Sequence, residues 1–192
     1  MEGLKFMVNY SKNDLSTLFS FPFPKQKEYE NTYLDIVAIQ TKENAISKIY
    51  AHYFDFNKSP KIATWFSTSL LDLIALKSNK TISIQNYNVF LEYVTLNNQG
   101  RIDIVIDSHL TQSAILIENK VYHWLHNDLE NYWDTFSHYS ENNRVGVLLA
   151  LTNLPDTNPN FISISHIELI SKVEQYSHVY YLGFFRDVSG QG

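Results

Sequence analysis

Two short aliphatic segments separated by a polar loop, within residues 100–120, constrain the fold of this chain more than any other feature. The stretch reads G-R-I-D-I-V-I-D-S-H-L-T-Q-S-A-I-L-I-E-N-K. In the first segment isoleucines alternate with other residues, among them Asp103 and Asp107, which is the period-two pattern of a β-strand. The second segment, residues 114–117, is apolar throughout and ends abruptly in E-N-K at residues 118–120. The pattern predicts two buried strands joined by a polar loop.

The charged side chains of these strands stand among apolar neighbours. Strands this aliphatic are typical of sheets covered on both faces, where acids and lysines are rare unless they are paired or bind a metal. Alternation places Glu118 and Lys120 on one face, and Asp103 shares that face if the two strands pair. Two carboxylates in a low-dielectric site repel each other unless a cation lies between them, and Mg²⁺ typically takes one or two carboxylates. The residues indicate a divalent metal site; the alternative is a plain hairpin with Asp103 in a turn and a surface pair of Glu118 and Lys120.

An Asp in one strand, followed by Glu-x-Lys at the end of the next, resembles the PD-(D/E)xK nuclease superfamily. The segments G-R-I-D-I-V-I and I-L-I-E-N-K are similar to a branch of bacterial members whose second motif is I-E-N-K. The resemblance covers about residues 33–151 and implies an α/β, restriction-endonuclease-like core, a mixed β-sheet flanked by helices. We expect residues 1–192 to form a single domain of this kind, with an N-terminal helical extension and a C-terminal helix and strand.

The resemblance also implies roles for individual residues. Asp103, Glu118 and the backbone carbonyl of Asn119 would hold Mg²⁺, with Mn²⁺ as a substitute. Lys120 would contact the attacking water and the scissile phosphate, with its pKa lowered by burial. Glu43 lies in T-K-E-N-A-I-S-K-I-Y-A-H-Y-F-D, which resembles the first core helix of the branch, and it would bind the metal directly or through water. Its alternative role is that of an acid in the first turn of a helix, where the helix dipole favours negative charge.

The helix expected after the motif departs from the pattern of the branch. That helix usually opens with a Gln that is followed four positions later by a Tyr. Tyr132 matches the Tyr, but Asp128 stands at the position of the Gln. An Asp there could pair with Lys120 or add negative charge near the metal. Both residues are therefore expected to lie around the metal ligands or against the substrate.

Hydrophobic periodicity supplies the remaining elements. Helices are predicted over residues 11–19, 33–39, 41–56, 61–76, 127–140 and 165–175, and further strands over residues 89–96, 145–151 and 179–185. Thr41 is the expected cap of the third helix, whose apolar stripe would be Ala45, Ile49, His52 and Phe56, and Leu70, Leu73 and Leu76 belong to the stripe of the next. Ser165 and Glu168 have the spacing of a capping box.

Composition limits the class of protein. There is no cysteine, which excludes disulfides and Cys-based zinc sites or nucleophiles and suits a reducing compartment. No apolar run approaches the roughly 20 residues of a membrane span, and we expect a cytoplasmic protein that has no membrane partner. The net charge of −5 argues against a generic DNA-coating protein. Residues 40–80 nevertheless hold six lysines against three acids, a region that could face a polyanion or form a solvated helix face.

The expected function is that of a Mg²⁺-dependent deoxyribonuclease that hydrolyses phosphodiester bonds, and the resemblance suggests bacterial or phage defence. The alternative is a catalytically inactive module of the same fold that binds nucleic acid or a protein partner, which Asp128 and the acidic charge favour. An RNA substrate is also open. A homodimer would supply the two active sites that cutting both strands requires. His123 and His126 could border the site, and Tyr122, Trp124 and Trp133 could stack on bases, although packing is the alternative use of each.

Overall fold

The computed structural model of the protein describes residues 42–121, 128–155 and 158–189, with side chains described as far as residue 177. Contacts divide the chain into Met1–Ile36, which lies outside the described residues, and Val37–Gly192, to which all the described residues belong. The helices predicted over residues 11–19 and 33–39 lie outside the described residues, as does Thr41. No helix of the described part is both long and apolar enough to cross a membrane.

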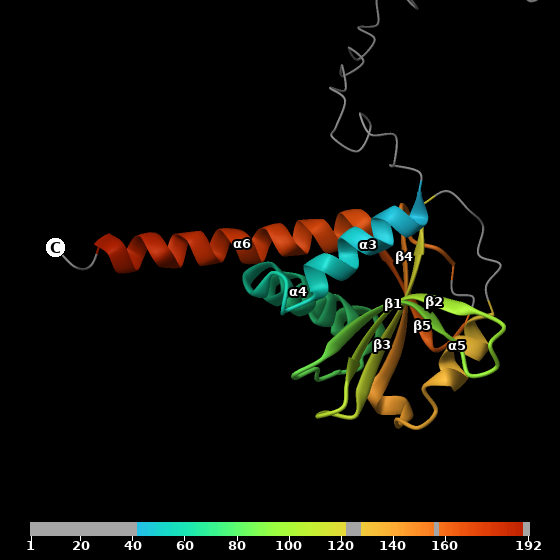
Figure 1. The fold of residues 1–192 in the computed structure, drawn as a ribbon. Coiled ribbons are helices and arrows are strands. Elements are labelled where there is room, and N and C mark those ends of the chain that lie inside the picture. Colours follow the sequence, from blue (N-terminus) through green and yellow to red (C-terminus); the bar gives the residue numbers. More distant parts are fainter. Residues whose placement is uncertain (1–41, 122–127, 156–157, 190–192) are drawn as a thin grey trace, which may run out of the picture. The chain divides into compact units, whose positions relative to one another are not determined.

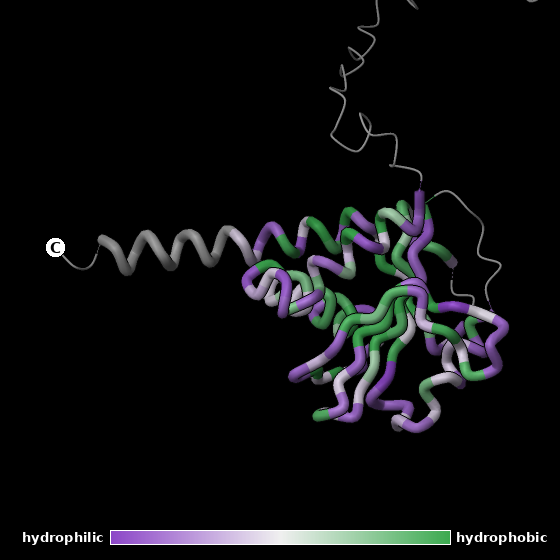
Figure 2. Tube along the Cα trace, viewed as in Figure 1, coloured by the Kyte–Doolittle hydropathy of each residue, from purple (hydrophilic) through white to green (hydrophobic). Residues whose placement is uncertain are grey.

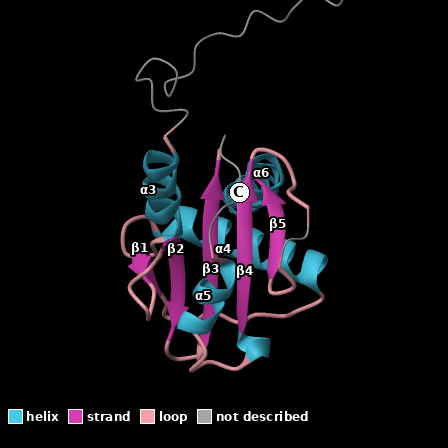
Figure 3. Cartoon of the chain, turned by 90° about the vertical axis from the view of Figure 1, so that its right-hand side faces the viewer, coloured by secondary structure: helices cyan, strands magenta, loops and turns pink. Residues whose placement is uncertain are grey.

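Five strands form one mixed sheet in the order β1-β2-β3-β4-β5 (Figure 3). They are β1 (Asn88–Val94), β2 (Arg101–Ser108), β3 (Ser113–Lys120), β4 (Arg144–Ala150) and β5 (Phe161–Ser165). The pairs β1–β2 and β2–β3 are antiparallel, which confirms the predicted hairpin within residues 100–120 and the strand predicted over residues 89–96. The pairs β3–β4 and β4–β5 are parallel. β3 is therefore the central strand, and it is the one that ends in the E-N-K motif.

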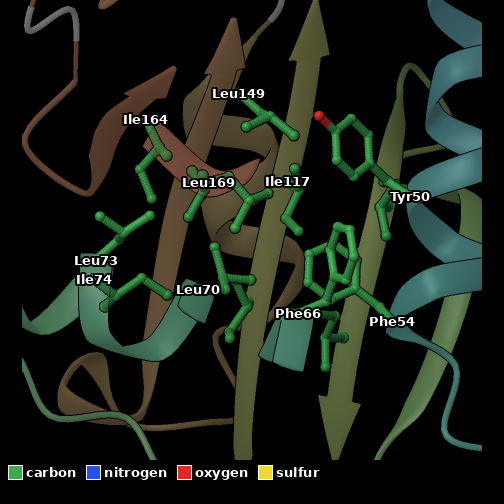
Figure 4. Packing of buried hydrophobic residues seen from close by; sticks show 14 of the residues in the cluster. Tyr50, Phe54, Phe66, Leu70, Leu73, Ile74, Ile117, Leu149, Ile164 and Leu169 are labelled. Atoms are coloured by element: carbon green, nitrogen blue, oxygen red, sulfur yellow. The ribbon is translucent and has the colours of Figure 1, made fainter. Parts of the chain in front are cut away.

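Helices cover both faces of this sheet (Figure 1). They are α3 (Glu43–Phe54), α4 (Pro60–Ser78), α5 (Leu129–Thr135) and α6 (His166–Ser189), with a short 3-10 turn at η1 (Glu141–Asn143). Side chains of α3, α4 and α6 pack against Ile115 and Ile117 of β3 (Figure 4), whereas α5 packs against Ala114 and Leu116 on the opposite face. This arrangement confirms the predicted α/β core of a mixed sheet flanked by helices.

The sheet carries most of the apolar sequence, and Figure 2 shows its strands largely in the colour of hydrophobic residues. The four aliphatic side chains of β3, residues 114–117, are fully buried. Burying one such side chain stabilises the fold by roughly 1.5–3 kcal/mol. The core can therefore tolerate a few polar groups that are held in it at a cost.

Several predicted details are wrong. Residues 179–185 continue α6 and form no strand, because no turn signal interrupts the helix after Gln175. The strand β5 was not predicted, since F-I-S-I-S follows a proline-rich loop and is short. Leu76 is 77% exposed, because Leu73 and Ile74 take the buried positions of the last turns of α4.

The predicted apolar stripe of α3 is also displaced. The buried residues of this helix are Ser47, Tyr50, Ala51 and Phe54. Phe56 lies beyond the helix and is 52% exposed, and the N-cap is Lys42, which makes no side-chain cap bond. A serine on the buried face hid the true stripe from a search for apolar spacing. The predicted capping box is confirmed: Glu168 accepts hydrogen bonds from the backbone and hydroxyl of Ser165, and Ser165 Oγ accepts from the Glu168 amide.

Candidate active site

Two acids meet where the β2–β3 ladder ends. The last pair of the register at this end joins Ile104 to Ile117, and the next residues of the two strands are Asp103 and Glu118. Residues opposite each other in an antiparallel pair share one face of the sheet. The Asn119 amide donates a hydrogen bond of 2.8 Å to Asp103 Oδ2. A side-chain carboxylate thus accepts from the backbone of the neighbouring strand, and this bond fixes Asp103 beside the E-N-K motif.

The ammonium group of Lys120 lies between two carboxylates. Its Nζ is 2.9 Å from Glu118 Oε1 and 3.5 Å from Glu43 Oε2. All three side chains are largely withdrawn from water, with exposed fractions of 12% for Lys120, 17% for Glu43 and 2% for Glu118. Glu118 and Lys120 reach the same point because alternation puts them on one face of β3.

The start of α3 is bound to the end of β3 by three hydrogen bonds. The Val121 amide donates to Glu43 Oε1 at 2.9 Å, and the Asn119 side-chain amide donates to the Glu43 carbonyl at 3.2 Å and to Ser47 Oγ at 2.9 Å. Ser47 itself donates to the Glu43 carbonyl one turn earlier. The Asn119 side chain therefore points to the α3 face, while its neighbours Glu118 and Lys120 point to the other.

The electrostatics of the site follow from burial. Burial and the nearby Asp103 carboxylate raise the pKa of Glu118 to about 7, although Lys120 lowers it. Burial likewise raises the pKa of Asp103 to about 6, against the lowering effects of the Asn119 backbone bond and of Lys120. Both acids hold their protons more tightly than in water, because burial disfavours the charged form and nearby carboxylates add to that cost. A cation placed between them would relieve that cost.

The expectation that burial lowers the pKa of Lys120 is wrong. Burial alone has that effect, but the charges of Glu118, Glu43 and Asp103 outweigh it, and the pKa of Lys120 is raised. The side chain is therefore an ammonium ion at neutral pH. It can donate hydrogen bonds and offset negative charge, but it cannot accept a proton.

The donor set suits a hard divalent cation. Glu118 Oε2 is buried and has no hydrogen-bond partner among the described residues, and the same is true of Asn119 Oδ1. A buried carboxylate oxygen without a partner is costly unless something outside the chain completes its environment. Within the described residues no three acids, histidines or cysteines are close enough together to hold a metal by themselves. Mg²⁺ commonly needs only one or two carboxylates and keeps several waters, so Asp103 and Glu118 fit it.

Asp128 and Tyr132 each form a hydrogen bond with a backbone group. The Asp128 carboxylate caps α5 by accepting a hydrogen bond of 3.1 Å from the Asn131 amide. The suggested pairing with Lys120 is therefore wrong, since the partners that the structure gives Lys120 are Glu43 and Glu118. Tyr132 is buried, and its hydroxyl donates to the Arg101 carbonyl at 2.7 Å. It thereby ties α5 to β2 two residues before Asp103.

Of the other candidates, Trp133 packs in the core and four residues lie outside the described part of the chain. Trp133 is buried, and the Arg144 guanidinium lies 4.1 Å from the centre of its ring, so its indole is part of the core. Tyr122, His123, Trp124 and His126 lie outside the described residues.

Sequence reasoning missed two residues close to the site, Ser47 and His166. His166 begins α6, and its Nδ1 lies 2.9 Å from the hydroxyl of Tyr50, a residue of α3. For Ser47 the available signal was its place four residues after Glu43 on one helix face. For His166 the sequence holds no local signal, because pairing of distant strands brings it there.

Comparison with known proteins agrees with this geometry. A family model described as the PD-(D/E)XK nuclease superfamily matches residues 31–181, most of the chain. No curated protein and no solved structure gives a significant match. The matched span contains the mixed sheet and every residue of the acidic site described above. The chain therefore belongs to the PD-(D/E)XK nuclease superfamily.

Proposed function

We propose that this protein is a Mg²⁺-dependent nuclease that hydrolyses DNA phosphodiester bonds. The observation that carries the proposal is the state of Glu118: its carboxylate is buried, one oxygen has no partner among the described residues, and a second, partly buried acid, Asp103, is close enough to raise its pKa. A purely structural acid in a core is normally hydrogen-bonded at both oxygens or replaced by an apolar residue.

Asp103, Glu118 and the backbone carbonyl of Asn119 would hold the metal in this proposal. A bound Mg²⁺ would offset the charge that develops on the phosphate and lower the pKa of a bound water. Mn²⁺ would substitute, since it favours the same oxygen ligands. Glu43 would take part directly or through water, although its carboxylate here accepts from the Val121 amide and pairs with Lys120.

Lys120 acts as a cation in this scheme. Because its pKa is raised, its ammonium group can donate to a phosphate oxygen or orient the attacking water, and another group must accept the water's proton. Glu118 and Glu43 hold the ammonium group at distances of 2.9 and 3.5 Å, so its position is set before substrate arrives. Such preorganisation lowers the cost of reaching the transition state.

The finer parts of the proposal rest on the sequence motifs. The I-E-N-K motif of residues 117–120 supports membership of the corresponding bacterial branch. Through that branch it also supports DNA as substrate and a role in bacterial or phage defence. A homodimer would allow both strands of a duplex to be cut. We also expect the protein to act in the cytoplasm, which the lack of cysteine suits.

A second candidate function is that of an inactive module of the same fold that binds nucleic acid or a protein. The observation that favours it is the Glu43 carboxylate, whose two oxygens are taken up by the Val121 amide and Lys120. A module of this kind would bind DNA with strong salt dependence and without need of a divalent ion.

The test is cleavage of supercoiled plasmid and of labelled duplex and RNA oligonucleotides, in Mg²⁺ and in EDTA. We expect wild type to cut DNA in Mg²⁺ only, and Asp103→Ala to be slower by about 10³-fold or more, because a metal ligand is lost. Asp107→Asn serves as the matched control, since Asp107 is a buried acid of the same strand outside the site. Equal cleavage by wild type and Asp103→Ala would refute the proposal. Binding without cleavage, and no Mn²⁺ binding heat that depends on Glu118, would support the inactive module.

A further inference from the structure

His166 reaches the end of β3 through the parallel half of the sheet. Lys120 is paired with Ala150 of β4, and Ala150 is paired with Ser165 of β5, so the three residues form one row across the sheet. His166 follows Ser165 directly as the first residue of α6. The chain thus turns from β5 into α6 at the level of Lys120.

The His166 ring is held against α3. Its Nδ1 lies 2.9 Å from the Tyr50 hydroxyl, and the two rings are stacked with centroids 5.5 Å apart and planes at 12°. Tyr50 is buried, and Figure 4 shows it among the aromatic and aliphatic residues on this face of the sheet. Tyr50 follows Glu43 and Ser47 at seven and three positions on α3, a spacing that puts all three on one side of the helix. The same helix face therefore touches the E-N-K motif at one end and His166 at the other.

The second nitrogen of the ring, Nε2, is not the one that lies against the Tyr50 hydroxyl. Nε2 is buried and has no hydrogen bond of ordinary geometry to the described residues. Burial lowers the pKa of His166. The backbone of Lys120 is close enough to the ring to have the opposite effect, although the smaller one. If the Tyr50 hydroxyl donates to Nδ1, the neutral ring carries its hydrogen on Nε2. A buried donor of this kind needs an acceptor, and the backbone of Lys120 is close enough to the His166 ring to supply one.

We infer that His166 is a positioning residue that holds the backbone of Lys120, with Tyr50 fixing the orientation of its ring. Glu118 and Glu43 hold the ammonium end of the same side chain. Lys120 is thereby fixed at both ends, by the acids of the site and by a histidine from the far end of the sheet. This inference rests on the proposed role of Lys120 in cleavage, and it adds a residue that touches neither metal nor substrate.

The kinetic test compares four variants under saturating Mg²⁺. We expect His166→Ala to lower kcat roughly 10-fold with KM nearly unchanged, because outer residues that orient catalytic groups typically contribute 10–100-fold. His166→Gln keeps a side-chain donor and should recover most of the lost rate. Tyr50→Phe should lower kcat by roughly a few-fold, because the ring loses the bond that fixes its orientation.

Tyr139→Phe is the matched control for Tyr50→Phe. Tyr139 is also buried and also bonds a histidine, with its hydroxyl 3.1 Å from His109 Nδ1, but at the opposite end of the β2–β3 hairpin. The kcat of Tyr139→Phe should equal that of wild type. Equal kcat losses in Tyr50→Phe and Tyr139→Phe, or no recovery in His166→Gln, would show a general effect on the fold and would overturn the inference.

A second arm needs no cleavage, so that it separates this inference from the proposed function. In metal-free protein the backbone carbonyl ¹³C resonance of Lys120 should shift in His166→Ala, shift little in His166→Gln and stay in place in Tyr139→Phe. An unmoved resonance in His166→Ala overturns the inference even if the enzyme is active. If wild type cuts no nucleic acid but the resonance moves as expected, the contact stands and the proposed function fails.

Discussion

The hairpin of β2 and β3 carries a buried acid at each end, and the two acids differ in how far their oxygens are bonded. At the loop end, Asp107 accepts a hydrogen bond of 2.9 Å from the Tyr139 hydroxyl, and His109 Nε2 lies 3.6 Å from its other oxygen. At the open end, one oxygen of Glu118 forms a salt bridge with Lys120, and the second oxygen has no partner among the described residues.

The difference separates a structural acid from a candidate functional one. Both residues are less than 10% exposed, so burial alone does not distinguish them. The distinguishing features are the oxygen without a partner and the second acid, Asp103, nearby. In a cation-binding site, some ligand oxygens have no hydrogen-bond partner within the chain until the cation binds.

Removing the basic side chain from each end gives the largest expected contrast. We expect Lys120→Met to lower the free energy of unfolding of the metal-free protein at pH 8 by ~3 kcal/mol, since it leaves buried carboxylates without a partner. His109→Ala at the loop end should change it by less than about 0.5 kcal/mol, because an exposed pair contributes little. The His109 side chain is 76% exposed. Urea unfolding in EDTA measures both, and equal losses would mean that the two ends do not differ.

Magnesium should stabilise one end only. At a Mg²⁺ concentration of 100 times Kd, the free energy of unfolding of wild type should rise by about 2.7 kcal/mol through binding to the folded state. Asp107→Asn should show the same rise, and Glu118→Gln should show almost none. Thermal unfolding with and without Mg²⁺ measures the effect. A rise that survives in Glu118→Gln would place the ion elsewhere.

The pH dependence of stability should reveal the strain at Glu118. The pKa of this group is raised from 4.5 to about 7 on folding, so the folded state prefers the neutral acid. The cost of the carboxylate is absent below pH 4.5, grows as the pH rises to 7 and is complete above it. Glu118→Gln should therefore stabilise the metal-free protein by up to ~2 kcal/mol at pH 8 and by little at pH 4.5.

The same titration in Asp107→Asn supplies the contrast for this prediction. That variant loses the hydrogen bonds of a satisfied acid, and we expect it to be less stable than wild type by about 1 kcal/mol at pH 8. Denaturant unfolding across the pH range measures both variants. A Glu118→Gln protein that is less stable than wild type at pH 8 would contradict the strained-acid interpretation.

The smallest effect belongs to Glu168, whose titration has the opposite sign. Burial would raise the pKa of Glu168, but Lys77 and the donors of Ser165 outweigh it and lower the pKa to about 2. Its carboxylate therefore stabilises the folded state above pH 4.5, and this contribution fades as the pH falls toward 2. Glu168→Gln should cost about 1 kcal/mol at pH 7, a figure reduced for solvent screening, and less at pH 3. A loss of the same size at both pH values would show that the charge does not matter.

Local pattern predicted the part of the site that lies within one hairpin. Alternation and short-range pairing bring Asp103, Glu118 and Lys120 together without help from distant residues. Glu43 was predicted only through the resemblance, since a helix periodicity does not say where the helix docks. Its place is set by the bonds from Asn119 to the start of α3.

Errors in the prediction arose where a polar residue is placed by a hydrogen bond and not by hydrophobic spacing. Ser47 sits on the buried face of α3 because the Asn119 side chain needs an acceptor there, so the apolar stripe was assigned to the wrong side. A pairing of Asp128 with Lys120 was one of two suggested roles, but the Asp128 carboxylate accepts from the Asn131 amide of its own helix. Both residues bond to backbone or amide groups, and hydrophobic spacing does not record such demands.

The sequence by itself determined the hairpin, the central aliphatic strand and the presence of charges that such a strand does not tolerate without a partner. These are consequences of a two-residue period and of the cost of burying charge, and both act over a few residues. Tertiary structure alone decided which distant groups lie around them: α3 brings Glu43 to Lys120, and β5 with α6 brings His166 to Tyr50, 116 residues away in the chain. Contacts over such separations depend on how strands pair and helices pack, and no local pattern of residues encodes them.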